Sequence, residues 1–318
     1  ENKYVCSVDI GGTKIATASW STRLTVVCPV PSLGRGSHRA QEGGEAVFQR
    51  IEASIKAALE ANPDVEVLGV GIGAAGVVDP KTGAIAYANE IMPGWSGVQL
   101  GPRLREDLGL PVAVVGDVQA HALGEAHWGV GKGKFSVLCL GIGTGIGGAY
   151  VESGRVMQGF HGAAGHMGHI ECSAAAGIPC ACGRSGHLES VASGTSIGRM
   201  YDERFGRVDP SRPSVGRDVN DLCRAGDAKA TEVIHDAGFA LGASLGSLAN
   251  ILDLGHRAFG RRDSPRSRLA FADVEGFGAQ GYASQALDPL QDTPILIGSL
   301  EGDAPLIGAA EHLLASLK

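Results

Sequence analysis

The fold is decided by the stretch Val8-Asp9-Ile10-Gly11-Gly12-Thr13-Lys14, in which an apolar run leads into two glycines and a threonine. This pattern predicts a buried strand that ends in a tight turn. The arrangement returns at Leu140-Gly141-Ile142-Gly143-Thr144-Gly145-Ile146-Gly147-Gly148. Two such turns, each at the head of its own part of the chain, predict two similar α/β domains that face one cleft.

The residues around these turns alternate between short apolar runs and segments of helical period. We predict strands at 4–10, 15–19, 24–30, 65–72, 112–115, 135–142 and 147–151. Helices are predicted at 46–61, 97–108, 120–128, over most of 220–252 and at 304–317. Strands that alternate with helices indicate an α/β fold on a mostly parallel sheet. We therefore expect an N-terminal α/β domain at 1–117, a C-terminal α/β domain at 118–303, and a closing helix at 304–318 that packs back on the first domain.

The composition excludes several classes of protein. The chain has 318 residues, of which 44% are hydrophobic and 19% charged, as in ordinary globular proteins. A net charge of −7 argues against binding to a nucleic-acid backbone. The nearest candidate for a membrane span, residues 135–151, contains five glycines and is too loose for one. With no leader pattern before the first strand and an odd count of seven cysteines, we expect a cytoplasmic protein.

The two glycine turns have the composition of anion sites. Glycine makes up 49 residues, about twice its usual share. Consecutive glycines beside a hydroxyl residue expose backbone N–H groups, and phosphate is the usual anion bound by such groups. A pair of ordinary hairpins is the other interpretation. Asp9, directly before the first turn, is placed to hold Mg²⁺ through water, since magnesium prefers carboxylates.

Asp117 follows a predicted buried strand, at the strand end where α/β proteins bind ligands. Partial burial there would raise the proton affinity of the carboxylate and suit it to general-base work on a hydroxyl. By position alone, the residue serves equally well as the N-cap of the helix that follows.

A third group of residues has the spacing of a metal site. Two cysteines, Cys180 and Cys182, are preceded by His169 and followed by His187. Two sulfur and two nitrogen ligands form a plausible zinc site, and a filled ligand shell indicates a structural role. The alternative is a pair of free thiols in a glycine-rich loop.

These motifs resemble the ROK family (repressors, unidentified open reading frames and sugar kinases) of the actin-like ATPase superfamily. Residues 9–14 and 141–148 are similar to the two phosphate turns of that superfamily, and Gly165–Glu189 resembles the zinc signature of the family. The resemblance implies two ribonuclease-H-like domains, ATP-dependent phosphorylation of a hexose 6-hydroxyl, and a homodimer.

The resemblance also implies roles for single residues. Asp117 matches the catalytic base, Asn89 a sugar-contacting asparagine and Glu189 a glutamate that reaches sugar hydroxyls. His169 matches a histidine that binds both sugar and Zn²⁺, with Cys180, Cys182 and His187 as the other zinc ligands. ATP and Mg²⁺ would be held by Asp9, Gly11, Gly12, Thr13, Lys14, Gly143, Thr144 and Gly145.

Some positions depart from the family pattern. Gly116 stands where most members have a sugar-binding asparagine, and His187 stands where the fourth zinc ligand is usually cysteine. His166 stands where the glucose kinases have a glutamate, and its His-x-x-His spacing with His169 is similar to bacterial N-acetylmannosamine kinases. A neutral imidazole there would admit a 2-acetamido group. We therefore expect N-acetylmannosamine as substrate, with glucose or another hexose as the alternative.

A non-catalytic sugar-binding or regulatory member of the family is the remaining alternative. The regulators carry a helix-turn-helix before the first phosphate turn, and eight residues precede Asp9 here, so we expect a kinase. The segment 254–268 is the strongest departure, because it contains five arginines where the family has an apolar strand. We do not expect it to form a buried strand. Its arginines either contact phosphate or lie in a solvated loop, and the segment is either a diverged loop or the product of a local frame shift.

Overall fold

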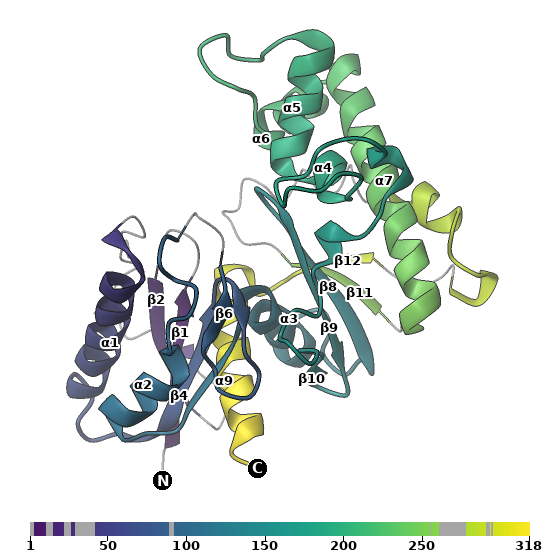
Figure 1. Cartoon of the computed structure of the whole chain (residues 1–318). Helices are drawn as coiled ribbons and strands as arrows, with labels where there is room; N and C mark the ends of the chain where they lie inside the picture. Colours follow the sequence, from purple (N-terminus) through teal and green to yellow (C-terminus); the bar gives the residue numbers. More distant parts are fainter. Residues whose placement is uncertain are drawn as a thin grey trace. The chain divides into compact units, whose positions relative to one another are not determined.

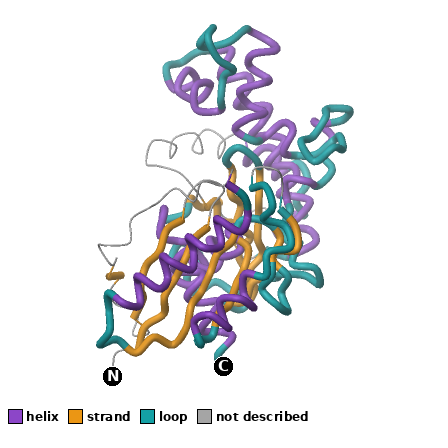
Figure 2. Tube along the Cα trace, turned by 60° about the vertical axis from the view of Figure 1, so that its left-hand side comes forward, coloured by secondary structure: helices purple, strands orange, loops and turns teal. Residues whose placement is uncertain are grey.

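The computed structural model describes residues 3–10, 15–21, 27–28, 42–88, 92–254, 256–260, 278–290, 293 and 295–318. The chain divides into two compact units. The first comprises Glu1–Gly133, Tyr150–Gly165 and Asp303–Lys318, and the second comprises Lys134–Ala149 and His166–Gly302. Strands and helices alternate along the chain, as the predicted α/β fold requires (Figures 1 and 2).

The first unit is built on a mixed sheet. Its strands are β1 (Lys3–Ile10), β2 (Ile15–Ser21), β3 (Val27–Cys28), β4 (Glu66–Ala74) and β7 (Val112–Gly116), with a separate pair of β5 (Val77–Val78) and β6 (Ile85–Tyr87). The order across the main sheet is β3-β2-β1-β4-β7, in which β1, β4 and β7 pair in parallel while β2 pairs antiparallel with both of its neighbours. The helices of this unit are α1 (Gly44–Glu60), α2 (Leu100–Leu108), α3 (Asp117–Trp128) and α9 (Ala304–Ser316).

The two faces of this sheet differ in side-chain size, and β4 shows why. Val70 and Ile72 belong to the apolar core that includes residues of α1 and α2. The residue between them is a glycine, and a Cβ on Gly71 would lie 2.1 Å from the carbonyl oxygen of Ala309 in α9. Successive side chains of a strand point to opposite faces. One face of β4 therefore builds the core, while the other lets the backbone of α9 approach.

Helix α9 also packs closely along α3. A Cβ on Gly308 would lie 1.6 Å from the carbonyl oxygen of Ala120, so only glycine permits this crossing. The indole N–H of Trp128 donates to Glu311 at 2.8 Å. Because of this packing α3 is part of the first unit, whereas the division expected from the sequence assigned residues from 118 onward to the second domain.

The second sheet has the order β10-β9-β8-β11-β12. Its strands are β8 (Ser136–Ile142), β9 (Ile146–Glu152), β10 (Arg155–Val156), β11 (His256–Gly260) and β12 (Ile295–Ile297). The helices α4 (Glu189–Ala192), α5 (Gly194–Phe205), α6 (Gly216–Arg224) and α7 (Ala228–Leu252) belong to the second unit, and residues 278–283 are helical as well. Short 3₁₀ turns cover Met167–His169 (η2), Ser173–Ala175 (η3), Asp288–Leu290 (η5) and Glu301–Asp303 (η6).

The arginine-rich segment corrects one expectation. His256–Gly260 forms β11, which lies between β8 and β12 and is parallel to both. We expected no buried strand in this segment, yet these residues pair as an interior strand of the sheet, because strand pairing is made by backbone groups and does not require an apolar sequence. The rest of the segment, from residue 261, lies outside the described residues.

Two further boundaries differ from the sequence-based expectation. The strand predicted at 24–30 is described only at Val27–Cys28. The helical region at 220–252 is divided into α6 and α7 by Gly226, which has a φ of +87°, and by Asp227, whose side chain accepts from the N–H of Ala230 at 2.7 Å. Gly226 therefore follows the C-cap residue of α6, and Asp227 is the N-cap of α7, so the predicted single helical region is two helices.

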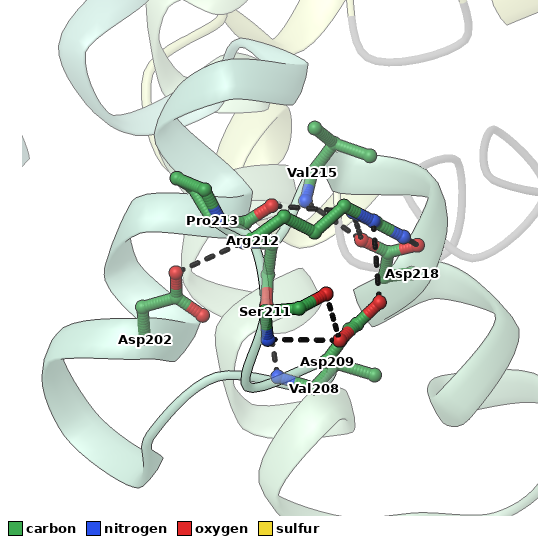
Figure 3. Close-up of polar contacts among 9 residues, drawn as sticks. Asp202, Val208, Asp209, Ser211, Arg212, Pro213, Val215 and Asp218 are labelled. Carbon is green, nitrogen blue, oxygen red and sulfur yellow. Dashed lines mark hydrogen bonds and ion pairs between the residues drawn. The ribbon is translucent and has the colours of Figure 1, made fainter.

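The loop between α5 and α6 is held by bonds to acidic side chains of both flanking helices (Figure 3). Arg212 binds Asp218 with two bonds of 2.7 and 2.9 Å, and the N–H of Ser214 donates to Asp202 at 2.9 Å.

In the described part of the chain, no helix has both the length and the apolar composition needed to cross a bilayer.

Candidate functional site

The structure brings the two predicted acidic residues of the first unit together. Asp9 lies near the end of β1 opposite Gly73 of β4, and Ala74 lies opposite Gly116 of β7. A Cβ on Gly73 would lie 3.7 Å from Oδ1 of Asp9 and 3.7 Å from Cα of Asp117. The two acidic residues therefore flank one glycine at the carboxyl ends of three parallel strands, where open α/β sheets bind ligands.

Asp117 is the first residue of α3, and its side chain is largely buried, with 8% of the residue exposed. Its Oδ1 accepts from the N–H of Val118 at 2.7 Å. A carboxylate at a helix N-terminus is stabilised by the helix dipole. The N-cap of α3 is Gly116, so the interpretation of Asp117 as the N-cap was wrong, and the bond from Val118 is not a cap bond because it joins neighbouring residues. The position at the sheet edge fits the general-base interpretation.

Part of the predicted site lies outside the described residues. This holds for Asn89, for the first glycine turn at Gly11, Gly12, Thr13 and Lys14, and so for the predicted contacts of these residues with sugar and ATP. Their assigned roles stay predictions.

The second glycine turn joins β8 to β9 in the second unit. The N–H of Gly143 donates to the carbonyl oxygen of Gly145 at 2.9 Å, and the carbonyl oxygen of Gly143 accepts from Gly194 at 2.8 Å. Gly143 and Thr144 are exposed. Oε2 of Glu189 accepts from the N–H of Ile146 at 2.8 Å, and a Cβ on Gly145 would lie 2.3 Å from that oxygen. An amide of this turn therefore already binds an anionic oxygen.

The four predicted metal ligands lie together in the loop that follows η2. One ligand atom from each of His169, Cys180, Cys182 and His187 lies within 4.8 Å of the others. Sγ of Cys180 is 3.7 Å from Nδ1 of His169, and Sγ of Cys182 is 3.3 Å from Nδ1 of His187. Bonds of about 2.0–2.3 Å to a tetrahedral zinc place ligand atoms roughly 3.3–3.8 Å apart. The donor set suits such an ion and these two separations fall within that range, while the four ligand atoms as a group are spread over up to 4.8 Å.

The loop reaches this arrangement through a narrow hairpin. Bridges join Glu171 to His187 and Pro179 to Ser185. The N–H of Cys180 donates to the carbonyl oxygen of Arg184 at 2.7 Å, which closes a tight turn around Cys182. Short backbone pairing thus brings sulfur and nitrogen atoms together from residues up to eighteen positions apart in the chain.

The electrostatics of the cluster favour metal-binding forms at two positions. Burial lowers the pKa of His169, against the opposing effect of Glu189, so the imidazole tends to be neutral. The backbone N–H of Arg184 lowers the pKa of Cys182 toward the thiolate. Burial raises the pKa of Cys180. A bound cation would counteract that rise, because it stabilises the thiolate.

His166 lies outside this ligand set but beside it. The residue is exposed, and its ring stacks on that of His169 with centroids 6.2 Å apart. Sequence reasoning placed His166 and His169 in one sugar site, and the structure brings their rings together. The bond from Ile146 to Glu189 was not predicted from the sequence, and neither were the contacts of Gln119 with Gly116 and Ala164. No spacing rule links these residues.

Comparison with known proteins places this geometry in a family. The model of the ROK family matches residues 5–314. The chain belongs to the ROK family. This ROK protein is 30% identical over 321 residues to a glucokinase of Halalkalibacterium halodurans. The aligned region covers 96% of this chain and 94% of the relative.

Two further comparisons cover nearly the whole ROK chain. It is 30% identical over 312 residues to an N-acetylmannosamine kinase of Yersinia pseudotuberculosis, with 98% of each chain covered. A solved structure of a ROK family glucokinase from Streptomyces griseus, in complex with glucose and AMPPNP, superposes on this chain with a TM-score of 0.78 at 27% sequence identity. The superposition covers 97% of this chain and 98% of the glucokinase chain. The predicted α/β fold and the predicted family are both confirmed.

Proposed function

We propose that this ROK protein is a kinase that transfers the γ-phosphoryl group of ATP to the 6-hydroxyl of a hexose. The observation that carries the proposal is the pairing of Asp9 and Asp117 around Gly73. The names of the relatives support it, since those relatives are a glucokinase and an N-acetylmannosamine kinase.

In this proposal Asp117 acts as the general base. Its carboxylate accepts the proton of the sugar hydroxyl while the oxygen attacks phosphorus in line. Burial of the carboxylate limits competition from water, and the bond from Val118 to Oδ1 fixes its orientation. Asp9 would hold Mg²⁺ through water, and the ion when bound would neutralise charge on the phosphates. Positioning and charge neutralisation provide most of the acceleration in such reactions.

The sugar would be held by Asn89, His166, His169 and Glu189, and the phosphates of ATP by the two glycine turns. The bond between Glu189 and Ile146 supports a close relation between the sugar side and the second turn. Zn²⁺ would be held by His169, Cys180, Cys182 and His187 and would keep the loop that carries His166 and Glu189 in shape.

We propose N-acetylmannosamine as the substrate because an exposed imidazole stands at position 166 next to His169. An imidazole ring can pack beside an acetamido group at a lower desolvation cost than a carboxylate. Glucose is the alternative, in keeping with the glucokinase relatives.

The test is an ADP-release assay with Mg²⁺ and ATP against N-acetylmannosamine, N-acetylglucosamine, glucose and mannose. We expect turnover on N-acetylmannosamine alone. Turnover on glucose instead would keep the kinase and discard the proposed role of His166. No turnover on any of the four by folded, zinc-loaded protein would overturn the kinase proposal and favour a sugar-binding protein without catalysis.

A further inference from the structure

We propose that Gln119 is a positioning residue, which ties the backbone directly before Asp117 to the segment that leads to His166. The consequences for catalysis rest on the proposed function. The two hydrogen bonds that make this connection can be tested without sugar or ATP.

The side chain of Gln119 makes two hydrogen bonds in opposite directions. Its Oε1 accepts from the N–H of Gly116 at 3.2 Å, and its Nε2 donates to the carbonyl oxygen of Ala164 at 3.2 Å. The residue is 6% exposed, so water competes little for these bonds. The orientation of the amide follows from its partners, because a backbone N–H only donates and a carbonyl only accepts.

Capping of α3 explains only the first of these bonds. A glutamine at the third position of a helix commonly accepts from the N–H of the N-cap residue, which here is Gly116. The second bond reaches a residue 45 positions further along the chain, in the same unit. No helix-capping role requires that contact, so it calls for a separate explanation.

The segment reached by the second bond contains two glycines in the left-handed region. Ala164 lies between Gly162 and Gly165, which have φ angles of +76° and +96°. Glycine loses more conformational entropy on ordering than other residues. A hydrogen bond from a buried side chain therefore limits the motion of this segment. His166, which the proposed function assigns to the sugar, follows two residues later.

Gly116 makes room for this amide. A Cβ at that position would lie 3.2 Å from Oε1 and 3.4 Å from Cδ of Gln119, closer than ordinary contact. A side chain at position 116 would therefore press on the amide of Gln119. The two residues form a matched pair, in which the glycine leaves the space that the glutamine fills.

The first experiment compares hydrogen exchange in Gln119→Ala, Gln119→Glu and the wild-type chain. Gln119→Ala loses both bonds. Gln119→Glu keeps an acceptor for Gly116 but places a carboxylate oxygen against the carbonyl of Ala164. We expect exchange of the Ala164 amide, which donates to Gln158 at 3.1 Å, to be about three- to tenfold faster in both variants, as the loss of one hydrogen bond implies.

The matched control is Gln99→Ala, which removes an exposed glutamine bound to the carbonyl oxygen of Gly97 at 3.0 Å in the same unit. Exchange at Ala164 should stay at the wild-type rate in this variant. Gly116→Ala, which keeps Gln119 but displaces its amide, should accelerate exchange at Ala164 as well. Unchanged exchange at Ala164 in both Gln119 variants would overturn this connection.

The second experiment measures the Kd for sugar without ATP, together with kcat. We expect sugar binding to weaken about three- to tenfold in both Gln119→Ala and Gln119→Glu. The kcat should fall only in Gln119→Ala. The KM for ATP should be unchanged in both variants. Faster exchange with wild-type Kd and kcat would make Gln119 a structural residue only and overturn the positioning role. If the wild-type chain binds sugar but turns none over, the proposed kinase fails, whereas the Kd of the variants still decides the role of Gln119.

Discussion

Glu189 accepts a hydrogen bond of 2.8 Å from the backbone N–H of Ile146, so that an acidic side chain from the start of α4 lies on the glycine turn between β8 and β9. A Cβ at position 145 would lie 2.3 Å from the carboxylate oxygen, so a larger residue there would displace the side chain of Glu189. The contact between Glu189 and Ile146 also joins two features that the sequence analysis assigned to different ligands, sugar and ATP.

The contact predicts a measurable coupling between positions 145 and 189. Gly145→Ala should lower the free energy of unfolding by about 1–2 kcal/mol in the wild-type chain, because the new methyl group displaces the carboxylate. In a Glu189→Ala background the same change should be less destabilising by about 1 kcal/mol. Urea denaturation of the four proteins of this double-mutant cycle gives the coupling. Strictly additive effects would show that the carboxylate does not lie on the turn.

Asp117→Asn separates catalysis from binding. The amide keeps an oxygen for the N–H of Val118 but is a far weaker base. We expect kcat to fall by a factor of about 10² to 10⁴, the usual contribution of a general base, while the Kd for sugar changes only a few-fold. The control is Asp107→Asn, on the exposed surface of α2. A loss of sugar affinity as large as the loss of turnover would contradict the assigned role.

The Cys/His cluster predicts a bound zinc ion in the purified protein. Elemental analysis should find about one zinc per chain, and none in Cys182→Ser. At a free zinc concentration a thousandfold above its Kd, binding stabilises the folded state by about 4 kcal/mol, so chelation should lower the Tm. Chelation should also weaken sugar binding, because His169 lies in both proposed sites.

Cys223→Ser is the control for the zinc measurement, since Cys223 is a partly buried free thiol outside the cluster. It should keep the full zinc content. Unchanged sugar affinity in metal-free, folded protein would refute the proposed support of the sugar site by the metal.

The buried imidazole of His121 in α3 predicts a pH-dependent stability. The residue is 3% exposed, and neither ring nitrogen has a hydrogen-bond partner among the described residues. Burial lowers the pKa of His121, although the carboxylate of Glu125 opposes this. The unfolded chain therefore takes up a proton near pH 6.5 that the folded chain does not. Stability is retained above that pH and lost as the pH falls below it.

Urea denaturation between about pH 5 and pH 7.5 should show this loss, with a slope of up to about 1.4 kcal/mol per pH unit from one such group. His121→Leu removes one titrating group and should make the slope shallower, while burial also lowers the pKa of His312 and His169, which remain. His235→Gln, which replaces a side chain that is 43% exposed, should leave the profile unchanged. An identical slope in His121→Leu and the wild-type chain would contradict the assignment.

Much of the fold could be predicted because its signals are local. Apolar runs located β1, β4, β7 and β8 to within a few residues, and helical periods located α1 and α9. The position of Asp117 at a strand end and the spacing of the four metal ligands were likewise readable in the sequence. The identity of the sugar, a homodimer and a cytoplasmic location stay predictions.

The remaining features depend on contacts between distant segments. The bond of Gln119 to Ala164 spans 45 residues, and that of Ile146 to Glu189 spans 43. No local pattern encodes either pairing. The strand β11 was missed for a related reason, because the backbones of β8 and β12 pair with a sequence that has little strand character of its own.

The close approach of α9 to the glycine face of β4 bears on how the protein is made. The strands of the first sheet leave the ribosome well before the helix that covers Gly71, because the strands of the second sheet are synthesised in between. Until α9 arrives, that face of the sheet lies open, and contacts between segments so far apart in sequence form slowly. A nascent chain that stalls before residue 304 would keep this surface exposed. Protection of nascent chains by chaperones should therefore matter most while the residues between β7 and α9 are being translated.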